Sequence, residues 1–271
     1  MHLGHILEHI QSDIWVRHQR LQNNNCTYIC GEDAHGTSIM LKAEEEGLTP
    51  EKLIEQVRVS HEEDFKAFNI SYDNYHTTHS DENQFYSETI FSRLKDKGLI
   101  EEKEIEQLYD TEKGLFLSDR FVQGTCPYCE ADKQYGDNCE VCSSTYSAID
   151  LINPISVLTN TKPELKKSLH LFFKLSSLQE EIKEWLNTSQ VPSQALNKLS
   201  EWTEGEIKDW DISRDAPYFG FKIPGYSNKY FYVWLDAPIG YLASHKNYLD
   251  CLLYTSPSPR DATLSGMACC G

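Results

Sequence analysis

The stretch Tyr28-Ile29-Cys30-Gly31-Glu32-Asp33-Ala34-His35-Gly36-Thr37 runs from an apolar segment into an acidic loop bounded by glycines. It predicts a strand at residues 28–30, a turn at 31–36 and a helix over about 38–46. In an open α/β sheet, ligands bind beyond the carboxyl ends of the strands, which is where Asp33 would lie. Taken alone, the segment is better explained as an acidic loop whose Asp caps the next helix.

Helical and strand-like segments flank this stretch. A second helix opens at Thr49-Pro50-Glu51, where Thr is suited to the N-cap and Pro to the first helical position. A strand-like segment follows at residues 69–72. Near the N-terminus, apolar residues recur at steps of three and four and predict a first helix: Leu3, Leu7, Ile10 and Ile14. The order helix, strand, helix, helix, strand predicts an α/β layer with a parallel sheet.

Two Cys-x-x-Cys motifs lie in the middle of the chain, Cys126-Pro-Tyr-Cys129 and Cys139-Glu-Val-Cys142, separated by nine residues. Four thiolates match the tetrahedral preference of zinc and leave no open position, which predicts one structural Zn²⁺ per chain. Iron is the main competing metal because four-cysteine sites also accept it. Redox-active pairs or unrelated surface thiols are the non-metal alternatives.

Composition narrows the class of protein. The net charge of −17 over 271 residues argues against a general nucleic-acid binder, which needs a basic surface to neutralise phosphates. No apolar run approaches the roughly 18 residues that cross a bilayer, and the N-terminus lacks the pattern of a signal peptide. We therefore expect a cytoplasmic protein with no membrane contact. Thiols stay reduced in the cytoplasm, so clustered cysteines there favour metal binding over disulfides.

The second half of the chain changes in character. A helix over about 82–97 should end at Gly98, and a strand is expected at 169–175. Ser177 and Glu180 have the spacing of a capping box ahead of a helix, and a further helix should begin at Pro192. The aromatic run at 230–235 predicts a buried strand that returns to the first sheet. We therefore expect a nucleotide-type domain that is interrupted by an insertion holding the cysteine motifs.

Two further segments carry weaker signals. In His2-Leu3-Gly4-His5, two imidazoles share one helix face close to a helix N-terminus, where phosphate binds readily, and Gly4 permits a close approach. The segment Trp234-Leu235-Asp236-Ala237-Pro238-Ile239-Gly240-Tyr241 could line an apolar pocket, although aromatic stretches are more often core. Neither segment identifies a function alone.

Taken together, these segments resemble one family, methionyl-tRNA synthetase of the bacterial zinc-containing type, a class I enzyme. The resemblance runs from His2 to Asp250 and rests on His2–His5, Asp33–Thr37, the cysteine motifs, and the segments 119–122, 210–220 and 230–241. It implies a Rossmann-like parallel sheet interrupted by an inserted connective-peptide domain. The expected boundaries are 1–80 and 230–250 for the catalytic domain and 81–229 for the insertion, with the zinc knuckle at 121–150.

The resemblance also implies ATP-dependent activation of methionine, with Mg²⁺ accompanying ATP, followed by transfer to tRNA(Met). His2, Gly4 and His5 would bind ATP, and the two histidines would steady the charge that develops in catalysis. Asp33 would bind the methionine ammonium group, and Arg214 would couple the inserted domain to the active site. The side-chain pocket for methionine would be formed by Trp234, Ala237, Pro238 and Tyr241. Cys126, Cys129, Cys139 and Cys142 would bind zinc.

The chain departs from the family pattern in three places. The strand that precedes the His motif, the lysine-bearing KMSKS loop and the anticodon-binding domain have no counterpart here, so we expect a fragment that is not competent for full turnover. Residues 251–271 lack periodicity and are expected to be a non-native tail. Two alternatives stay open: a non-catalytic zinc-binding or RNA-associating remnant, and a related class I synthetase for a branched aliphatic amino acid.

Overall fold

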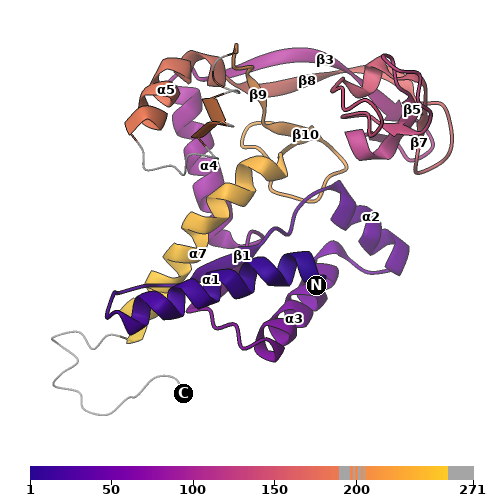
Figure 1. The fold of residues 1–271 in the computed structure, drawn as a ribbon. Coiled ribbons are helices and arrows are strands. Elements are labelled where there is room, and N and C mark those ends of the chain that lie inside the picture. The colour runs from indigo at the N-terminus through magenta and orange to yellow at the C-terminus, as the bar shows by residue number, and fades with distance from the viewer. Residues whose placement is uncertain (189–195, 198, 201–202, 204, 256–271) are drawn as a thin grey trace. The chain divides into compact units, whose positions relative to one another are not determined.

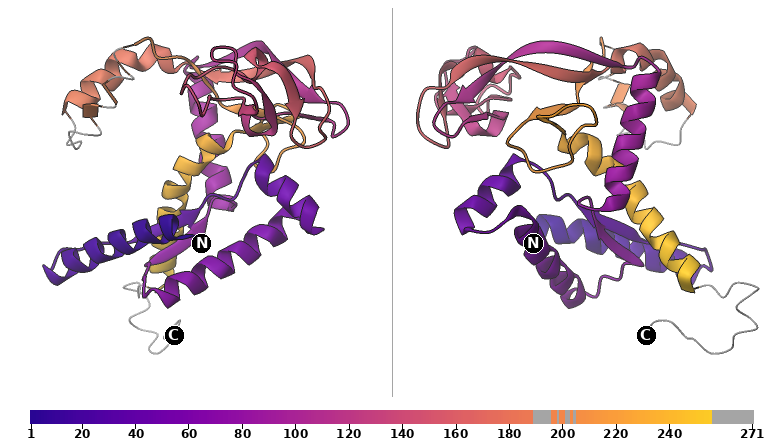
Figure 2. Two further views of the ribbon diagram at one scale, coloured as in Figure 1. Left: turned by 45° about the vertical axis from the view of Figure 1, so that its right-hand side comes forward. Right: turned by 180° about the vertical axis from the view of Figure 1, so that it is seen from behind.

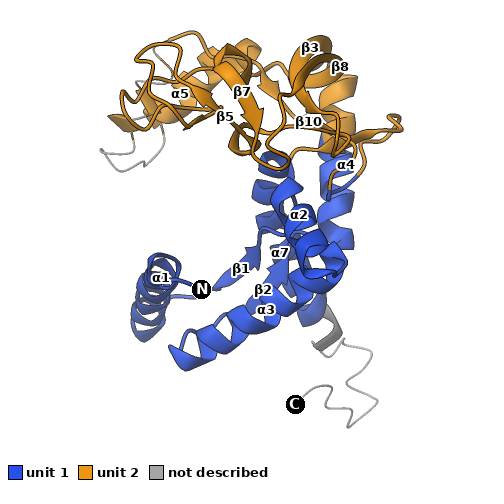
Figure 3. Cartoon of the chain, turned by 90° about the vertical axis from the view of Figure 1, so that its right-hand side faces the viewer, with its two compact units in different colours: residues 1–90, 219–221, 233–271 blue, residues 91–218, 222–232 orange. Residues whose placement is uncertain are grey.

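The structure is a computed structural model that describes residues 1–188, 196–197, 199–200, 203 and 205–255. The chain divides into two compact units (Figure 3). Unit 1 comprises residues 1–90, 219–221 and 233–271, and unit 2 comprises residues 91–218 and 222–232. Among the helices of the described residues, none has the length and apolar character needed to span a bilayer.

Unit 1 is built on two short parallel strands, β1 (Ile29–Glu32) and β2 (Asn74–Thr77), paired so that Ile29 lies opposite Asn74 and Glu32 opposite Thr77 (Figure 1). This pairing confirms the predicted parallel α/β layer. The helices of this unit are α1 (Leu3–Leu21), α2 (Thr37–Glu46), α3 (Pro50–Ala67), the first residues of α4 (Asp81–Asp96), and α7 (Val233–Thr255).

The ends of these helices follow from local chemistry. Thr49 accepts a hydrogen bond from the Lys52 amide at 3.3 Å and Pro50 occupies the first turn, as predicted for the start of α3. Gly47, with φ of 67°, ends α2 in the left-handed conformation that glycine adopts without strain.

Two strands differ from their predicted positions. β1 begins one residue later than expected and extends to Glu32. The strand expected at 69–72 is instead the turn that ends α3: Asn69 has a φ of 57°, and the Ile70 amide donates to the Phe65 carbonyl at 2.9 Å. Ile70 is apolar because it packs in a core with Ile6 and Phe65, and not because it lies in a strand.

Helix α1 confirms the predicted helix, but its buried residues are Ile6, Asp13 and Val16. Leu3 and Ile14, two of the periodic residues, are 82% and 61% exposed. Asp13 is buried because its carboxylate accepts a hydrogen bond from the Ser71 amide at 3.0 Å, a contact that sequence spacing does not reveal.

The prediction of a strand at 230–235 that returns to the first sheet is wrong both in the residues it includes and in the strand it pairs with. β11 (Lys229–Phe231) pairs antiparallel with β10 (Ser213–Asp215) in unit 2, and the chain becomes helical at Val233. Beyond that point, the buried hydrophobic residues are Leu235, Ile239 and Ala243, at the spacing of four that defines a helix face. The aromatic run therefore spans two elements, which local hydrophobicity alone does not divide.

Unit 2 is largely antiparallel. The four-stranded sheet has the order β4-β3-β8-β9, and β3 and β8 form its long twisted ribbon (Figure 2). A three-stranded sheet has the order β6-β5-β7. The strands are β3 (Ile100–Asp110), β4 (Leu115–Phe116), β5 (Val122–Thr125), β6 (Gln134–Tyr135), β7 (Ile152–Ser156), β8 (Glu164–Phe173) and β9 (Trp210–Asp211). The remaining elements are the helix α5 (Gln179–Thr188) and the 3₁₀ turns η1 (Asp119–Phe121), η2 (Ala148–Asp150) and η3 (Leu175–Leu178).

Three predictions fall in this unit. The strand expected at 169–175 is part of the longer β8, which ends where η3 begins. The helix after Ser177 is confirmed as α5, but the capping box is wrong, since the Ser177 hydroxyl donates to the Lys174 carbonyl at 2.7 Å. The helix expected from Pro192 lies largely outside the described residues.

A buried ionic network joins the strands of unit 2. The His170 side chain has no exposed surface, and its Nδ1 and Nε2 lie 2.7 Å from Asp211 and 3.0 Å from Asp215. Lys229 Nζ reaches Asp215 at 2.6 Å and Ser168 at 2.8 Å. Because ionised carboxylates only accept hydrogen bonds, both ring nitrogens of His170 must carry protons to satisfy both contacts.

The charges in this network support one another. Burial disfavours a charged imidazole, but the hydrogen bonds with Asp211 and Asp215 outweigh that effect and raise the pKa of His170 above its ordinary value of 6.5. Burial likewise opposes ionisation of Asp215, yet its bonds to His170, Lys229 and Ser168 lower its pKa to about 2.

Replacing His170 by Leu should reduce the free energy of unfolding by about 3 kcal/mol at pH 6, because two largely buried carboxylates each lose one of their cationic partners. Because the pKa of His170 is higher in the folded than in the unfolded protein, the charged imidazole stabilises the folded state fully below about pH 6. This stabilisation is lost as the pH rises through the raised pKa. Urea denaturation at pH 6 and pH 9 should therefore show the larger loss at pH 6.

The exposed pair of Lys167 and Glu104 supplies the control, and Lys167→Leu should leave the free energy of unfolding nearly unchanged at both pH values. Equal losses at both pH values for His170→Leu would contradict a charged imidazole.

Candidate functional site

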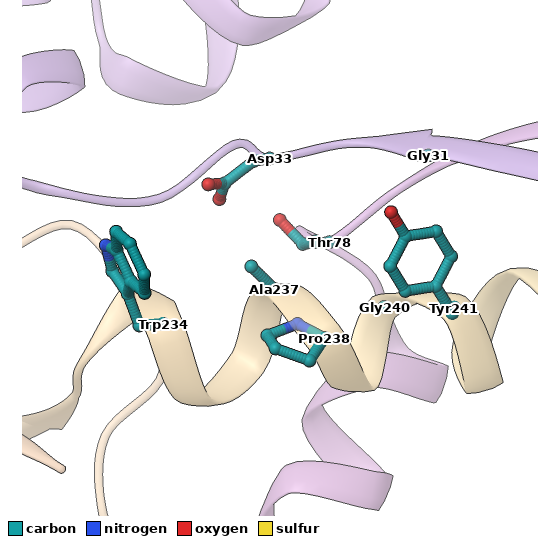
Figure 4. A pocket seen from close by; sticks show the side chains of 8 residues that line it. All are labelled: Gly31, Asp33, Thr78, Trp234, Ala237, Pro238, Gly240 and Tyr241. Atoms are coloured by element: carbon teal, nitrogen blue, oxygen red, sulfur yellow. The ribbon is translucent and has the colours of Figure 1, made fainter. Parts of the chain in front are cut away.

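A cavity of about 320 Å³ opens in unit 1 beside the end of β1, and we name it cavity A. One side is formed by β1, the loop after it and the residue that follows β2, and the other by helix α7. Figure 4 shows the Asp33 carboxylate facing α7 across the space that Trp234 and Ala237 border. The lining residues are Gly31, Asp33, Thr78, Trp234, Ala237, Pro238, Gly240 and Tyr241.

The structure thus places Asp33 beside four residues of α7 that lie about 200 positions later in the chain, and all five were predicted for one methionine site. Trp234, Ala237, Pro238 and Tyr241 lie at positions i, i+3, i+4 and i+7 of α7, which share one face of a helix. They come from the first turns of a helix and not from the end of a strand, which corrects the sequence-based placement. Three lining residues were not predicted: Gly31 stands in the quoted stretch, Gly240 lies within the aromatic segment, and Thr78 has no local signal.

Close packing holds α7 against the two strands. A Cβ added to Gly31 would lie 2.9 Å from Ser244 Oγ, and one added to Gly240 would lie 2.7 Å from Thr78 Cγ2. A larger residue at either point would force the facing side chain or the helix to shift, and the γ-methyl group of the β-branched Thr78 has less freedom to do so than the Ser244 hydroxyl. Thr78 has a second role, since its hydroxyl accepts a hydrogen bond from the Ala34 amide at 2.9 Å and so fixes the loop that carries Asp33.

The Asp33 carboxylate lines cavity A, where it is accessible to solvent but partly desolvated by the surrounding protein, and it forms no ion pair with the described residues. Burial, and then the charge of Asp236, raise the pKa of Asp33 to about 6, while nearby His35 has the smaller opposite effect. An acid held in this way gains free energy when a cation enters and compensates its charge. Apolar and aromatic side chains on the facing helix suit a ligand that carries a cationic group and an apolar chain.

A second cavity of about 410 Å³, cavity B, adjoins the first and shares Gly31 and Asp33 with it. It also includes His5 of α1, the only residue of the predicted ATP-binding set that lines either cavity. Glu32 contributes a carboxylate whose pKa burial raises to about 7, and its Oε2 has no hydrogen-bond partner among the described residues. Its other lining residues are Met1, Glu8, His9, Cys30, Ala34, Ile39, Ile54, Val57, His61 and Tyr75.

The start of α1 is closed by one of its own histidines. His2 is the N-cap residue of α1. Its Nδ1 accepts hydrogen bonds from the backbone amides of Gly4 at 3.1 Å and His5 at 3.4 Å. The rings of His2 and His5 stack with centroids 3.5 Å apart. The two histidines therefore lie together as predicted from their spacing, but two of the amides that could meet a phosphate are engaged by His2.

Arg214 lies on β10 in unit 2. Its guanidinium stacks over the Tyr232 ring at 3.6 Å, and its Nη1 donates to the Ser213 carbonyl at 2.6 Å and to Asp211 at 3.1 Å. Through Asp211 it adjoins the His170 network.

The four predicted cysteines converge in unit 2, and their sulfur atoms all lie within 4.8 Å of one another. Cys126 and Cys142 are 3.9 Å apart, and Cys129 and Cys139 are 3.6 Å apart. Sulfur atoms at the corners of a regular tetrahedron, each bound to zinc at about 2.3 Å, lie about 3.8 Å apart. The spacing therefore fits a tetrahedral metal ion.

The backbone around this cluster favours thiolates. Amide groups of Tyr128, Val141 and Cys142 donate to cysteine sulfurs at 3.4 Å, the first to Cys126 and the others to Cys139. Hydrogen bonding with Ser144 lowers the pKa of Cys142, whereas the other three thiols outweigh a hydrogen bond from the Ala131 backbone and raise the pKa of Cys129, so the four cysteines do not all favour the thiolate without a metal ion. The cluster can hold a metal ion with thiolate ligands, and it belongs to unit 2, whereas both cavities belong to unit 1.

A parallel α/β layer with a cavity at the end of its strands, together with four cysteines that could hold a metal ion, defines the class as an α/β protein with a candidate ligand site and a candidate metal site. A family model described as tRNA synthetases class I (M) matches residues 1–253. The chain belongs to this family.

Solved structures share its fold. A crystal structure of Mycobacterium tuberculosis methionyl-tRNA synthetase bound by methionyl-adenylate is 21% identical with a TM-score of 0.67, and the match covers 90% of this chain and 44% of that one. A second structure of the same enzyme with methionyl-adenylate gives the same values. The chain spans less than half of the length of these proteins, with which it shares the class I synthetase fold.

Gly240→Ala should push α7 off the strands and reduce the free energy of unfolding by about 1–3 kcal/mol, despite the better helix propensity of Ala. Thr78→Ser removes the γ-methyl group but keeps the hydroxyl that fixes the Asp33 loop, so the double variant should recover most of the loss. Thermal and urea denaturation of the two single variants and the double variant form the complete cycle. Additive losses would mean that this contact does not set the position of the helix.

Proposed function

We propose that this chain is part of a methionine–tRNA ligase and that cavity A binds methionine. The observation that carries the proposal is the pairing of a partly desolvated carboxylate, Asp33, with an apolar and aromatic face of α7 in one cavity. An amino acid with an apolar side chain presents the matching groups, an ammonium and a hydrocarbon or thioether chain. Support also comes from the family and from the structural relatives, whose bound ligand is methionyl-adenylate.

Each group in the cavity would have a defined role. Asp33 would accept hydrogen bonds from the ammonium group, and Trp234, Ala237, Pro238 and Tyr241 would enclose the thioether chain. A thioether offers few polar groups to recognise, so selectivity for methionine would depend on the shape of the cavity and on excluding water. Because apolar pockets discriminate weakly between aliphatic chains, leucine, isoleucine and valine are the relevant competitors.

The reaction that follows is adenylate formation. The methionine carboxylate attacks the α-phosphorus of ATP, the bond to the bridging oxygen breaks, and pyrophosphate leaves with its Mg²⁺. No covalent intermediate with the enzyme is required, so the protein contributes positioning and charge stabilisation. His2, Gly4 and His5 would bind the ATP phosphates at the start of α1, where His2 would have to release the amides that it caps. Transfer of methionine to tRNA(Met) completes the activity of the whole enzyme.

The remaining parts of the chain would support this site. We take residues 1–80 and 230–250 as the catalytic domain and residues 81–229 as the inserted connective domain, with Arg214 as the residue that couples the two. Cys126, Cys129, Cys139 and Cys142 would hold one structural Zn²⁺, which would stabilise a segment too small to form its own core. Cytoplasmic localisation is expected from the family.

Asp33→Asn should weaken methionine binding at pH 7.5 about tenfold or more, since a charge-assisted hydrogen bond to the ammonium is lost. In the unsubstituted chain, the affinity should fall as the pH drops through about 6, because the raised pKa makes Asp33 neutral there. Isothermal titration calorimetry from pH 5 to 8 measures both effects, with Asp250→Asn as the matched control. Binding of leucine in preference to methionine would exclude the proposed substrate.

Metal analysis of the purified chain should give about one zinc per molecule, as four thiolates on a single ion require. Cys129→Ser should lower the zinc content and make the peptide bonds of residues 126–142 susceptible to limited proteolysis. Cys251→Ser, which alters an exposed cysteine of α7, is the control and should do neither. Iron in place of zinc would appear directly in the metal analysis, and a folded, protease-resistant chain without metal would refute the structural role.

A further inference from the structure

Three side chains from separate segments meet behind cavity A, and we name this group the His35 bridge. His35 lies in the loop after β1, His79 follows β2, and Asp236 lies in the first turn of α7. His35 Nδ1 bonds to Asp236 Oδ2, and neither side chain has exposed surface. On the other side of the ring, His35 Nε2 lies 2.9 Å from His79 Nδ1.

The bridge connects the two walls of the cavity. His35 is two residues beyond Asp33, and Asp236 lies between Trp234 and Ala237 in α7. A shift of the His35 ring would therefore move the carboxylate on one wall relative to the apolar face on the other.

The surroundings leave the His35 ring little freedom. Its edge contacts Phe219 and Phe221, with ring centroids 5.4 and 4.6 Å away. The Gly36 amide donates to the Phe219 carbonyl at 2.9 Å, which fixes the backbone next to the ring. Asn83 secures the same region, since its side-chain amide donates to the carbonyls of Thr78 at 2.8 Å and Asp236 at 3.2 Å.

Asp236 also acts on Asp33 through its charge. Its Oδ1 is buried and has no hydrogen-bond partner among the described residues, so much of the charge on this carboxylate is uncompensated. Burial raises the pKa of Asp236, and its charge is the second cause, after burial, of the raised pKa of Asp33. The other titratable groups around these two carboxylates are Glu32, His35 and His79, together with His5, Glu8, His9 and His61 across cavity B and Glu51 and Asp81 beside His79.

We propose that His35, His79 and Asp236 are positioning residues that hold the Asp33 loop against α7 and thereby fix the width of cavity A. None of the three lines the cavity, so they would act through Asp33 and the facing helix rather than by touching the ligand. The inference rests on the proposed function only in taking methionine as the ligand. Holding the Asp33 loop in position affects methionine affinity at pH 8, whereas the charge of Asp236 affects the midpoint of the pH dependence. Two variants separate these effects.

His35→Phe keeps an aromatic ring against Phe219 and Phe221 but removes both ring nitrogens. Methionine affinity at pH 8, where Asp33 is ionised, should fall at least fivefold because the two walls are no longer tied. His76→Phe makes the same substitution on β2, outside the bridge and both cavities, and should change affinity by less than twofold. A folded His35→Phe protein with unchanged affinity would overturn the proposal.

Asp236→Asn keeps an oxygen that accepts from His35 but removes the charge. Affinity at pH 8 should stay within twofold of the unsubstituted chain, while the midpoint of the pH dependence should move below its original value, since Asp33 loses a neighbouring negative charge. A purely structural role would lower affinity at every pH and leave the midpoint in place. That result would refute the action of Asp236 on Asp33.

Crystal structures without ligand test the bridge independently of methionine. In His35→Phe, the Asp33 carboxylate should lie farther from the Trp234 indole than in the unsubstituted chain, and an unchanged separation would refute the positioning role. If His35→Phe does not fold, His79→Phe replaces it, since it removes only the half-buried end of the bridge and should widen the cavity less. A chain that fails to bind methionine but shows the widened cavity would refute the proposed function and leave the bridge supported.

Discussion

The close approach of helix α7 to the two parallel strands is the constraint on which unit 1 depends. Gly31 and Gly240 leave no room for a Cβ atom, so Ser244 and Thr78 pack directly against the backbone of the opposite element. At this distance, the first turns of α7 form a wall of cavity A, and Asp236 reaches the His35 ring. A helix displaced by one methyl group would alter both the cavity and the buried contact behind it.

This arrangement keeps carboxylates in surroundings that disfavour their charge. Glu32, Asp33 and Asp236 all have raised pKa values, chiefly because the protein removes water from around them. Asp236 is paired with His35 and Glu32 lies 3.7 Å from His61, whereas Asp33 has no ion pair among the described residues. Holding uncompensated acids costs folding free energy, which a cationic ligand returns on binding. Under the proposed function, the ammonium group of the ligand would supply this missing positive charge.

Unit 2 consists largely of short strands and loops, and polar clusters contribute to holding them together. Two polar clusters contribute: four converging cysteines at one place, and the His170 network, which joins β8, β9, β10 and β11, at another. In the network, the cations and carboxylates offset the cost of one another's burial, as the lowered pKa of Asp215 and the raised pKa of His170 show. Arg214 extends this network to Tyr232.

Local chemistry by itself determined the helices with clear caps, the parallel α/β class and the four-cysteine cluster, because those signals depend on residues within a few positions of one another. Thr49 and Pro50 start a helix in any context, and paired Cys-x-x-Cys motifs bring their own geometry. Only the tertiary structure decided that the aromatic run at 230–235 divides between a strand and a helix, that Asp13 rather than Leu3 faces inward, and that Thr78 and Asp236 support the cavity. Each of these depends on partners outside the local sequence, from Asp215 opposite Lys229 in the β10–β11 pair to His35 and Asp236, which are 201 residues apart. No local pattern encodes their packing and hydrogen bonds.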